Sequence, residues 1–173
     1  DAPALAALEA GGTVLLTIPP ARVRGDERGE VALGFSSIFW NTAWTKRQAP
    51  HTLGIRCDPK HSALAAFPTD YHSNWQWWYL VSQAGAMILD GLPRELRPIV
   101  QVVDDWVTNR KLGLVFEARV GRGKLLVCSI ELQRDQNPVS RQMRASLLHY
   151  VASQQFSPPA SLTADQVRGL MKP

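Results

Sequence analysis

The alternation of apolar and polar positions is most informative in the middle of the chain, where it predicts β-strands. Residues 98–106 and 112–132 contain three runs rich in Val, Leu, Ile and Phe. The glycine-flanked turn at 121–123 predicts a tight hairpin between the last two runs. Polar Glu117 and Arg119 alternate with apolar neighbours, which predicts one wetter face on that strand. The run at 124–130 is almost wholly apolar, which favours a strand covered on both sides.

The first twenty residues carry signals for a helix, a stop and a strand. Ala, Leu and Glu dominate residues 3–10, and Gly11 and Gly12 then predict the end of a helix. Residues 13–18 follow as a short apolar run, typical of a buried strand. A helix followed by a strand is the second half of a β-α-β unit, and the strand that should precede the helix is missing. The pattern therefore predicts a piece of a longer polypeptide.

The last third of the chain carries two helical patterns. Residues 137–154 predict an amphipathic helix that begins at Asn137 and Pro138. Its sheet-facing side is predicted to consist of Val139, Met143, Leu147 and Leu148. Residues 157–173 predict a Pro/Ser linker followed by a short helix, capped by Thr163 with Gln166 three residues later.

Together these elements predict an α/β fold with one main domain. A mainly parallel sheet with helices on its faces and an antiparallel hairpin near one edge is expected over residues 1–156. Residues 157–173 are expected to form the linker and a short C-terminal helix. The length of 173 residues agrees with a single domain.

Composition and charge exclude several functional classes. The formal net charge is +4, but the basic residues occur in twos and threes with acids between them, so no nucleic-acid partner is expected. No apolar run approaches the roughly 20 residues of a membrane helix, and no signal peptide is visible at the N-terminus. The two cysteines are too few for a disulfide framework, and Cys128, within an apolar run, is expected to be a buried thiol.

The motifs of catalytic and cofactor sites are missing. The chain has no nucleophile elbow, no phosphate-binding glycine loop and no His-Glu-x-x-His metal motif. Adjacent Asp104 and Asp105 allow a metal site, but an acid that ends a strand and an acid that caps a turn are the favoured interpretation. The sequence therefore predicts no catalytic residue, no metal ligand and no cofactor.

The most unusual stretch is HSNWQWWYL at 72–80, because it holds three of the six tryptophans of the chain. Adjacent Trp77 and Trp78 must point in different directions, and Trp78 is predicted to be the core residue. Trp75 and Trp77 would share a face if the segment is extended. The candidate ligand or interdomain surface consists of His72, Asn74, Trp75, Gln76 and Trp77, with Trp40 and Trp44 upstream. The alternative, that all three clustered tryptophans are core, has even weight.

Four stretches carry a resemblance to a known family. They are SSIFWNTAW at 36–44, FPTDYHSNWQWW at 67–78, KLGLVFEARVGRGKLLVCS at 111–129 and SRQMRASLLHYVAS at 140–153. Over roughly residues 11 to 155 the chain resembles the C-terminal accessory region of bacterial glycoside hydrolase family 2 proteins. These are β-galactosidase-like enzymes that carry a sugar-binding domain.

The resemblance implies a fold and a role. The implied fold is a three-layer sandwich like that of class I glutamine amidotransferases, a flavodoxin-like architecture. The amidotransferase triad is missing, because no cysteine elbow is present and no histidine is followed two residues later by glutamate. The fold would thus be catalytically silent. The glycosidase carboxylates would lie upstream, in a (β/α)₈ barrel that this chain is too short to contain.

The expected function is that of a non-catalytic accessory domain of a carbohydrate-active enzyme, supporting domain packing, assembly or carbohydrate binding. The expected partners are the catalytic glycosidase domain of the parent chain and carbohydrate, and a homo-oligomer is also possible. The implied parent is a periplasmic or secreted bacterial protein. Two alternatives remain: a stand-alone carbohydrate-binding module, and a hydrolase with an unrecognised site.

Overall fold

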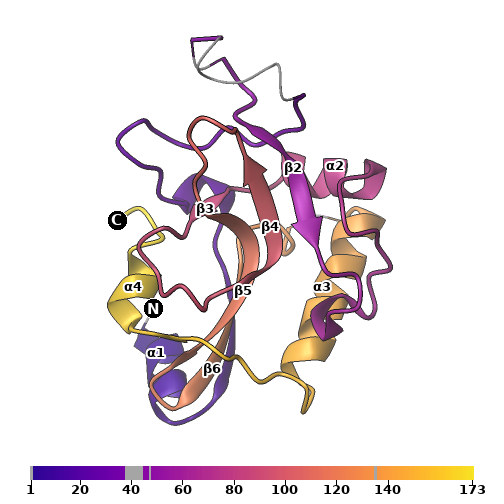
Figure 1. Ribbon diagram of the computed structural model, residues 1–173. Helices are drawn as coiled ribbons and strands as arrows, with labels where there is room; N and C mark the ends of the chain where they lie inside the picture. The colour runs from indigo at the N-terminus through magenta and orange to yellow at the C-terminus, as the bar shows by residue number, and fades with distance from the viewer. Residues whose placement is uncertain (1, 38–44, 47, 135) are drawn as a thin grey trace.

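The structure is a computed structural model that describes residues 2–37, 45–46, 48–134 and 136–173. It has a mixed α/β fold in which helices cover both faces of one sheet (Figure 1). The helices are α1 (Ala2–Glu9), α2 (Trp75–Ser82), α3 (Pro138–Val151) and α4 (Ala164–Arg168), with single 3₁₀ turns η1 (Pro20–Arg22) and η2 (Ser62–Leu64). None of the helices formed by these residues is long and apolar enough to cross a membrane.

Within the residues that the structure describes, the sheet contains seven strands. They are β1 (Thr13–Thr17), β2 (Thr52–Cys57), β3 (Met87–Ile88), β4 (Pro98–Asp104), β5 (Leu112–Val120), β6 (Gly123–Cys128) and β7 (Ser161–Leu162). Their order is β1-β6-β5-β4-β2, and the short strands β3 and β7 both pair with β5. Strand β1 therefore lies at one edge of the sheet and β2 at the other.

The prediction of a mainly parallel sheet is wrong. Only β1 with β6 and β5 with β7 are parallel, and the other four pairings are antiparallel. The reason lies in the connections, because neighbouring parallel strands need a crossover of a dozen or more residues. Strands β4, β5 and β6 follow one another through short turns, so they can pair only in the antiparallel sense. The predicted hairpin at 121–123 is confirmed, with β6 next to the edge strand β1 and β5 as the central strand.

Each face of the sheet has its own hydrophobic core. The first core joins the sheet to α2 and α3, through side chains such as Trp77, Leu80, Met143 and Leu147. The second core joins the opposite face to α1 and α4, through Leu8, Val167 and neighbours. In Figure 1, α1 and α4 accordingly lie on the left of the sheet and α3 on the right.

The predicted helix at 137–154 is confirmed as α3, with Asn137 as its N-cap. Met143 and Leu147 are buried as predicted and Val139 is half-buried, but Leu148 is 47% exposed, so its predicted sheet-facing position is wrong. Consecutive helical residues are about 100° apart, and the buried stripe continues from Leu147 to Tyr150 instead.

Residues 157–173 pack closely against the rest of the chain. Strand β7 pairs with the end of β5, and Ala160, Leu162, Val167 and Leu170 are buried in the second core. Thr163 caps α4 in a reciprocal capping box with Gln166, which confirms the predicted start of this helix.

Candidate functional site

The tryptophan-rich stretch forms helix α2, and Asn74 determines where that helix begins. The Asn74 Oδ1 atom accepts a hydrogen bond from the backbone N–H of Trp77 at 3.2 Å, as an N-cap does. The backbone of Asn74 itself is extended, with φ −142° and ψ −172°. Residues 75–78 therefore follow helical spacing, so side chains three apart come together and side chains two apart diverge.

Trp77 is the core residue of this stretch. Its side chain is fully buried, its indole Nε1 donates to Thr69 Oγ1 at 2.7 Å, and its ring meets Phe67 edge-on at 5.4 Å. Trp78 is 52% exposed and Trp75 is 84% exposed. The prediction that Trp78 is the core residue is therefore wrong, and the shared face of Trp75 and Trp77, expected for an extended segment, does not form because the segment is helical.

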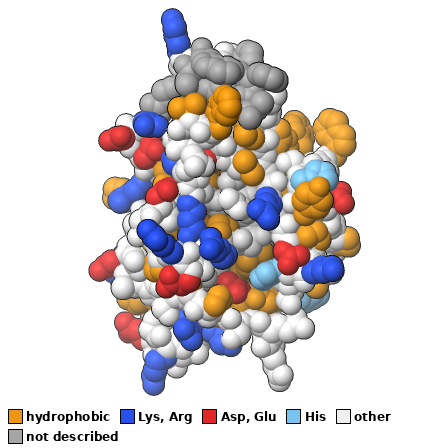
Figure 2. Space-filling model, viewed as in Figure 1, with side chains coloured by type: hydrophobic (Ala, Val, Ile, Leu, Met, Phe, Trp, Pro, Cys, Tyr) orange, Lys and Arg blue, Asp and Glu red, His pale blue; other side chains and the backbone are white. Residues whose placement is uncertain are grey.

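Trp75 and Trp78 instead form an exposed aromatic pair. Their ring centroids are 6.1 Å apart and their planes lie at 65°, an edge-to-face arrangement. Together with Phe35, Ser73 and Asn74 they line an open hollow on the surface. We call Phe35, Trp75 and Trp78 the α2 aromatic surface. Figure 2 shows apolar side chains projecting beside a histidine in the upper right, where Figure 1 places α2.

Polar residues of the predicted site and the neighbouring Ser73 hold the surrounding loop in place. Gln76 Nε2 donates to the Pro68 carbonyl at 2.9 Å, and Ser73 Oγ accepts from the Ile55 N–H at 2.9 Å. His72 forms a backbone bridge to Arg56 of β2, and its ring meets that of Tyr71 at 4.8 Å. The contacts of His72 and Ser73 anchor this loop to β2, and the exposed large apolar side chains beside them are Tyr71, Trp75 and Trp78.

The structure thus brings together part of the predicted surface. His72, Asn74, Trp75 and Gln76 lie at or just before the first turn of α2, while Trp77 points inward. The sequence interpretation missed Phe35 and Trp78 as surface residues. Trp40 and Trp44, which were also predicted, lie outside the described residues.

The acidic pair at the end of β4 has structural roles, as the favoured interpretation predicted. Asp105 Oδ1 accepts from the N–H groups of Val107 and Thr108, both at 2.9 Å, and so caps the turn. Asp104 is buried, and its Oδ2 accepts a hydrogen bond from Arg110 Nε at 2.8 Å. Among the residues that the structure describes, no group of three or more His, Cys, Asp or Glu side chains could hold a metal ion.

The buried titratable groups are poorly suited to nucleophilic catalysis. Burial raises the pKa of the Cys57 thiol to about 11 and that of Cys128 to about 12, so both are protonated at neutral pH. Tyr150 donates to Glu117 Oε2 at 2.7 Å, and burial together with this carboxylate raises the tyrosine pKa well above its ordinary value. The predicted wetter face of β5 is wrong at Glu117, which α3 covers and which is buried, whereas Arg119 near the end of the strand is exposed.

Comparison with known proteins yields one family. The model of the family described as a domain of unknown function (DUF8487) matches residues 1–172, which is nearly the whole chain. A search of curated proteins found no match.

Proposed function

We propose that this chain, which belongs to the DUF8487 family, is a non-catalytic accessory domain of a carbohydrate-active enzyme of the glycoside hydrolase family 2, β-galactosidase-like type. In this proposal the α2 aromatic surface docks the domain onto the catalytic glycosidase domain of the same enzyme. The observation that carries the proposal is the exposure of Trp75 and Trp78 as a pair beside an open hollow.

Exposed tryptophans of this kind are suited to docking. Tryptophan is enriched among the few interface residues that carry most of the binding energy, because it combines a large apolar area with little rotamer freedom. The neighbouring polar groups of Ser73, Asn74 and Gln76 already bond to the local backbone. The surface therefore offers apolar area more than hydrogen-bonding groups, which favours a protein surface as its partner.

The edge-to-face indoles also support a second candidate function, carbohydrate binding. Sugar rings present apolar C–H faces that pack on aromatic side chains, and both indoles border the same hollow. The 65° angle between the rings means that a flat sugar can lie on one indole and meet the edge of the other. This is the role expected of a carbohydrate-binding module.

The architecture implied by the family resemblance is part of the same proposal. A relationship to class I glutamine amidotransferases, with their flavodoxin-like layers, is supported by helices on both faces of the sheet and by the parallel pair β1–β6. The antiparallel pairing of the central strands departs from that architecture.

Docking is tested by hydroxyl-radical footprinting of the tryptophans in the isolated domain and in the complete polypeptide that contains it. We expect Trp75 and Trp78 to oxidise about tenfold more slowly in the complete polypeptide, because a partner domain excludes water from a docked interface. Trp106, which is 54% exposed in the turn between β4 and β5, is the matched control and should keep its rate. Equal oxidation rates for Trp75 and Trp78 in both proteins would contradict docking.

Carbohydrate binding is tested separately on the isolated domain. Amide NMR spectra are recorded with galactose, lactose and β-linked oligosaccharides, for the parent sequence and for Trp75→Ala and Trp106→Ala. Binding at the α2 aromatic surface predicts shifts around residues 73–78 that Trp75→Ala abolishes and Trp106→Ala retains. Unchanged spectra across the panel would reject carbohydrate binding and leave docking as the function.

A further inference from the structure

The outer edge of β1 is open. Two hydrogen bonds bracket its pairing with β6: Lys124 N–H to the Gly12 carbonyl at 3.0 Å, and Ile18 N–H to the Cys128 carbonyl at 2.8 Å. In a parallel ladder alternate residues bond to the neighbour, so Val14 and Leu16 face β6. Thr13, Leu15 and Thr17 therefore direct their N–H and C=O groups outward. Within the part of the chain that the structure describes, no strand pairs with this side.

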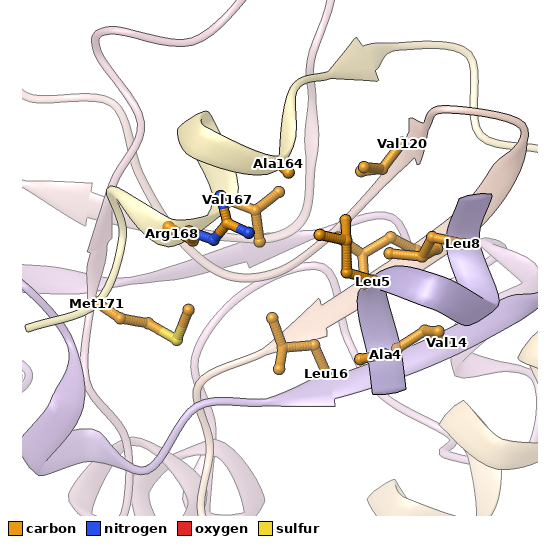
Figure 3. Close-up of a pocket in the computed structure, with 11 residues that line it drawn as sticks. Ala4, Leu5, Leu8, Val14, Leu16, Val120, Ala164, Val167, Arg168 and Met171 are labelled. Carbon is orange, nitrogen blue, oxygen red and sulfur yellow. The ribbon is translucent and has the colours of Figure 1, made fainter. Parts of the chain in front are cut away.

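An apolar groove adjoins this open edge. Val14 and Leu16 lie at its floor, and it continues between α1 and α4 (Figure 3). Its other lining residues are Ala4, Leu5, Leu8, Val120, Leu125, Ala164, Val167, Arg168 and Met171. Val14, Leu16, Ala4 and Leu5 are only half-buried. Whatever pairs with β1 would therefore also cover apolar surface beside it.

The sequence of β1 is close to a palindrome: Thr-Val-Leu-Leu-Thr. We propose that a second copy of this chain pairs its β1 with this edge in the antiparallel sense, about a two-fold axis at Leu15. Leu15 then faces Leu15 of the other copy, and Thr13 faces Thr17, and every outward N–H and C=O of these residues is bonded. The same register places Val14 opposite Leu16 on the groove side. Threonine pairs and apolar pairs across strands both stabilise such a sheet.

The charged residues near the two ends of β1 are of both signs. At the start of the strand, the Arg122 guanidinium lies at the backbone of Glu9, where Nε donates a hydrogen bond to the carbonyl at 3.0 Å. At the other end, Gln133 donates to Thr17 Oγ1, and Glu131 accepts from the N–H groups of Gln133 and Arg134. A two-fold axis brings the start of one strand to the end of the other. Each end then meets a mixed pair of charges, and no block of one sign opposes another.

The contact through β1 alone is small, which favours a weak association. Stable interfaces bury about 1,200–2,000 Å² in total, which is more than two short strands can supply alone. The half-buried apolar residues of α1 and the groove must contribute the rest, so a dissociation constant of the order of micromolar is expected. The association is therefore measured by analytical ultracentrifugation of the 173-residue chain at about 1–500 µM.

A charge-swap pair of variants tests the register. In Thr13→Lys/Thr17→Lys, lysine opposes lysine at both ends of the paired strands, whereas in Thr13→Lys/Thr17→Glu, lysine opposes glutamate at both ends. Within one copy the two positions are four residues apart along an extended strand, roughly 13 Å, so the sign of the charge at 17 changes little in the monomer. Both variants lose the Gln133 contact equally. We expect the Lys/Lys variant to dimerise roughly tenfold more weakly than the Lys/Glu variant, with a smaller difference in high salt.

Amide hydrogen exchange provides an independent readout on the unmodified chain. The Leu15 N–H points outward and should exchange more slowly as concentration rises, while the Leu16 N–H bonds to β6 and should be protected at every concentration. A chain that is monomeric at all these concentrations overturns the proposal, as does equal dimerisation of the two charge variants. Both outcomes are independent of the α2 aromatic surface, so they leave the proposed function unaffected.

Discussion

At the scale of single residues, the most constrained group is the carboxylate of Asp104. Its side chain is 1% exposed, and the Arg110 guanidinium bonds to both of its oxygens, at 2.8 and 3.1 Å. The same guanidinium reaches Asp26 at 3.0 Å, which links a distant loop to the end of β4. These bonds to Asp104 raise the pKa of Arg110 above its ordinary value. Arg110 therefore offsets the free-energy cost of burying the Asp104 carboxylate.

Removal of this partner should be costly. Arg110→Met is expected to lower the free energy of unfolding by about 3–5 kcal/mol, because it leaves a buried carboxylate without its counter-charge. The control is Arg168→Met, whose bridge to Asp165 is solvent-exposed and should contribute less than about 1 kcal/mol. Urea unfolding monitored by circular dichroism measures both. Similar losses of unfolding free energy in the two variants would show that the buried Arg110–Asp104 pair stabilises the fold no more than an exposed pair does.

The two buried thiols predict a pH dependence of stability. In the unfolded chain a cysteine ionises near its ordinary pKa of about 8.5, whereas burial raises the pKa to about 11 for Cys57 and about 12 for Cys128. Because the folded pKa is the higher one, the thiol contribution is fully present below about pH 8.5 and is lost as the pH rises above it. Urea unfolding between pH 8 and 10.5 should show stability falling by up to about 1.4 kcal/mol per thiol per pH unit.

The control for this pH dependence is the Cys57→Ala/Cys128→Ala variant. Its absolute stability will differ because of lost packing, so the comparison is between the slopes of stability against pH. We expect a shallower slope above pH 9 in the variant. Parallel slopes would mean that the thiols titrate alike in the folded and unfolded chains.

At the scale of elements, the sequence predicted the helices and turns that are determined by residues close together in the chain. The hairpin between β5 and β6 follows from its glycine-flanked turn, and α3 follows from its period and from Asn137. Helix α2 was missed because its sequence, WQWWYLVS, consists largely of aromatic and aliphatic residues without a clear helical period. Packing of Trp77 and Leu80 into the first core determines that helix. Because helix α2 was missed, the exposed pair of Trp75 and Trp78 was missed too. These two side chains come together only when the segment is helical.

The local signal that α2 does carry is its cap. Asn74→Ala should cost about 1 kcal/mol, because the Trp77 N–H loses its acceptor. Asn74→Asp should cost little, since a carboxylate also accepts at this position and favours the positive end of the helix. Thermal and urea unfolding of both variants measure the difference. Equal losses for Ala and Asp would contradict the capping role of the Asn74 side chain.

At the scale of the whole molecule, the two ends of the chain meet. Val23 forms a backbone bridge with Met171, the Lys172 N–H donates to the Arg22 carbonyl, and α1 and α4 share the second core. Strand β7 is only two residues long, too short for any periodicity, so its pairing with β5 could not be predicted from the sequence. Helices α1, α3 and α4 follow from patterns within each segment, whereas strand direction depends on which strands pair and on the length of the connections between them. Helices on both faces were therefore foreseen, and the mainly antiparallel sheet was not.

The packing of the C-terminal segment predicts that residues 1–156 do not fold stably alone. Deletion of 157–173 removes Leu162, Val167 and Leu170 from the second core, and each buried side chain of this size contributes about 1.5–3 kcal/mol. The total is comparable with the roughly 5–15 kcal/mol that stabilises a whole domain. We expect the deletion variant to lose cooperative urea unfolding and amide NMR dispersion.

Two point variants measure how much single residues of this segment contribute to the stability of the intact chain. Leu162→Ala should cost about 2–5 kcal/mol, because it leaves a cavity beside β5. Its exposed neighbour gives the matched control, since Ser161→Ala keeps β7 paired and should change stability by less than about 0.5 kcal/mol. A deletion variant that unfolds cooperatively with native-like stability would show that residues 157–173 are a linker, because only a segment outside the cooperative core can be removed without loss.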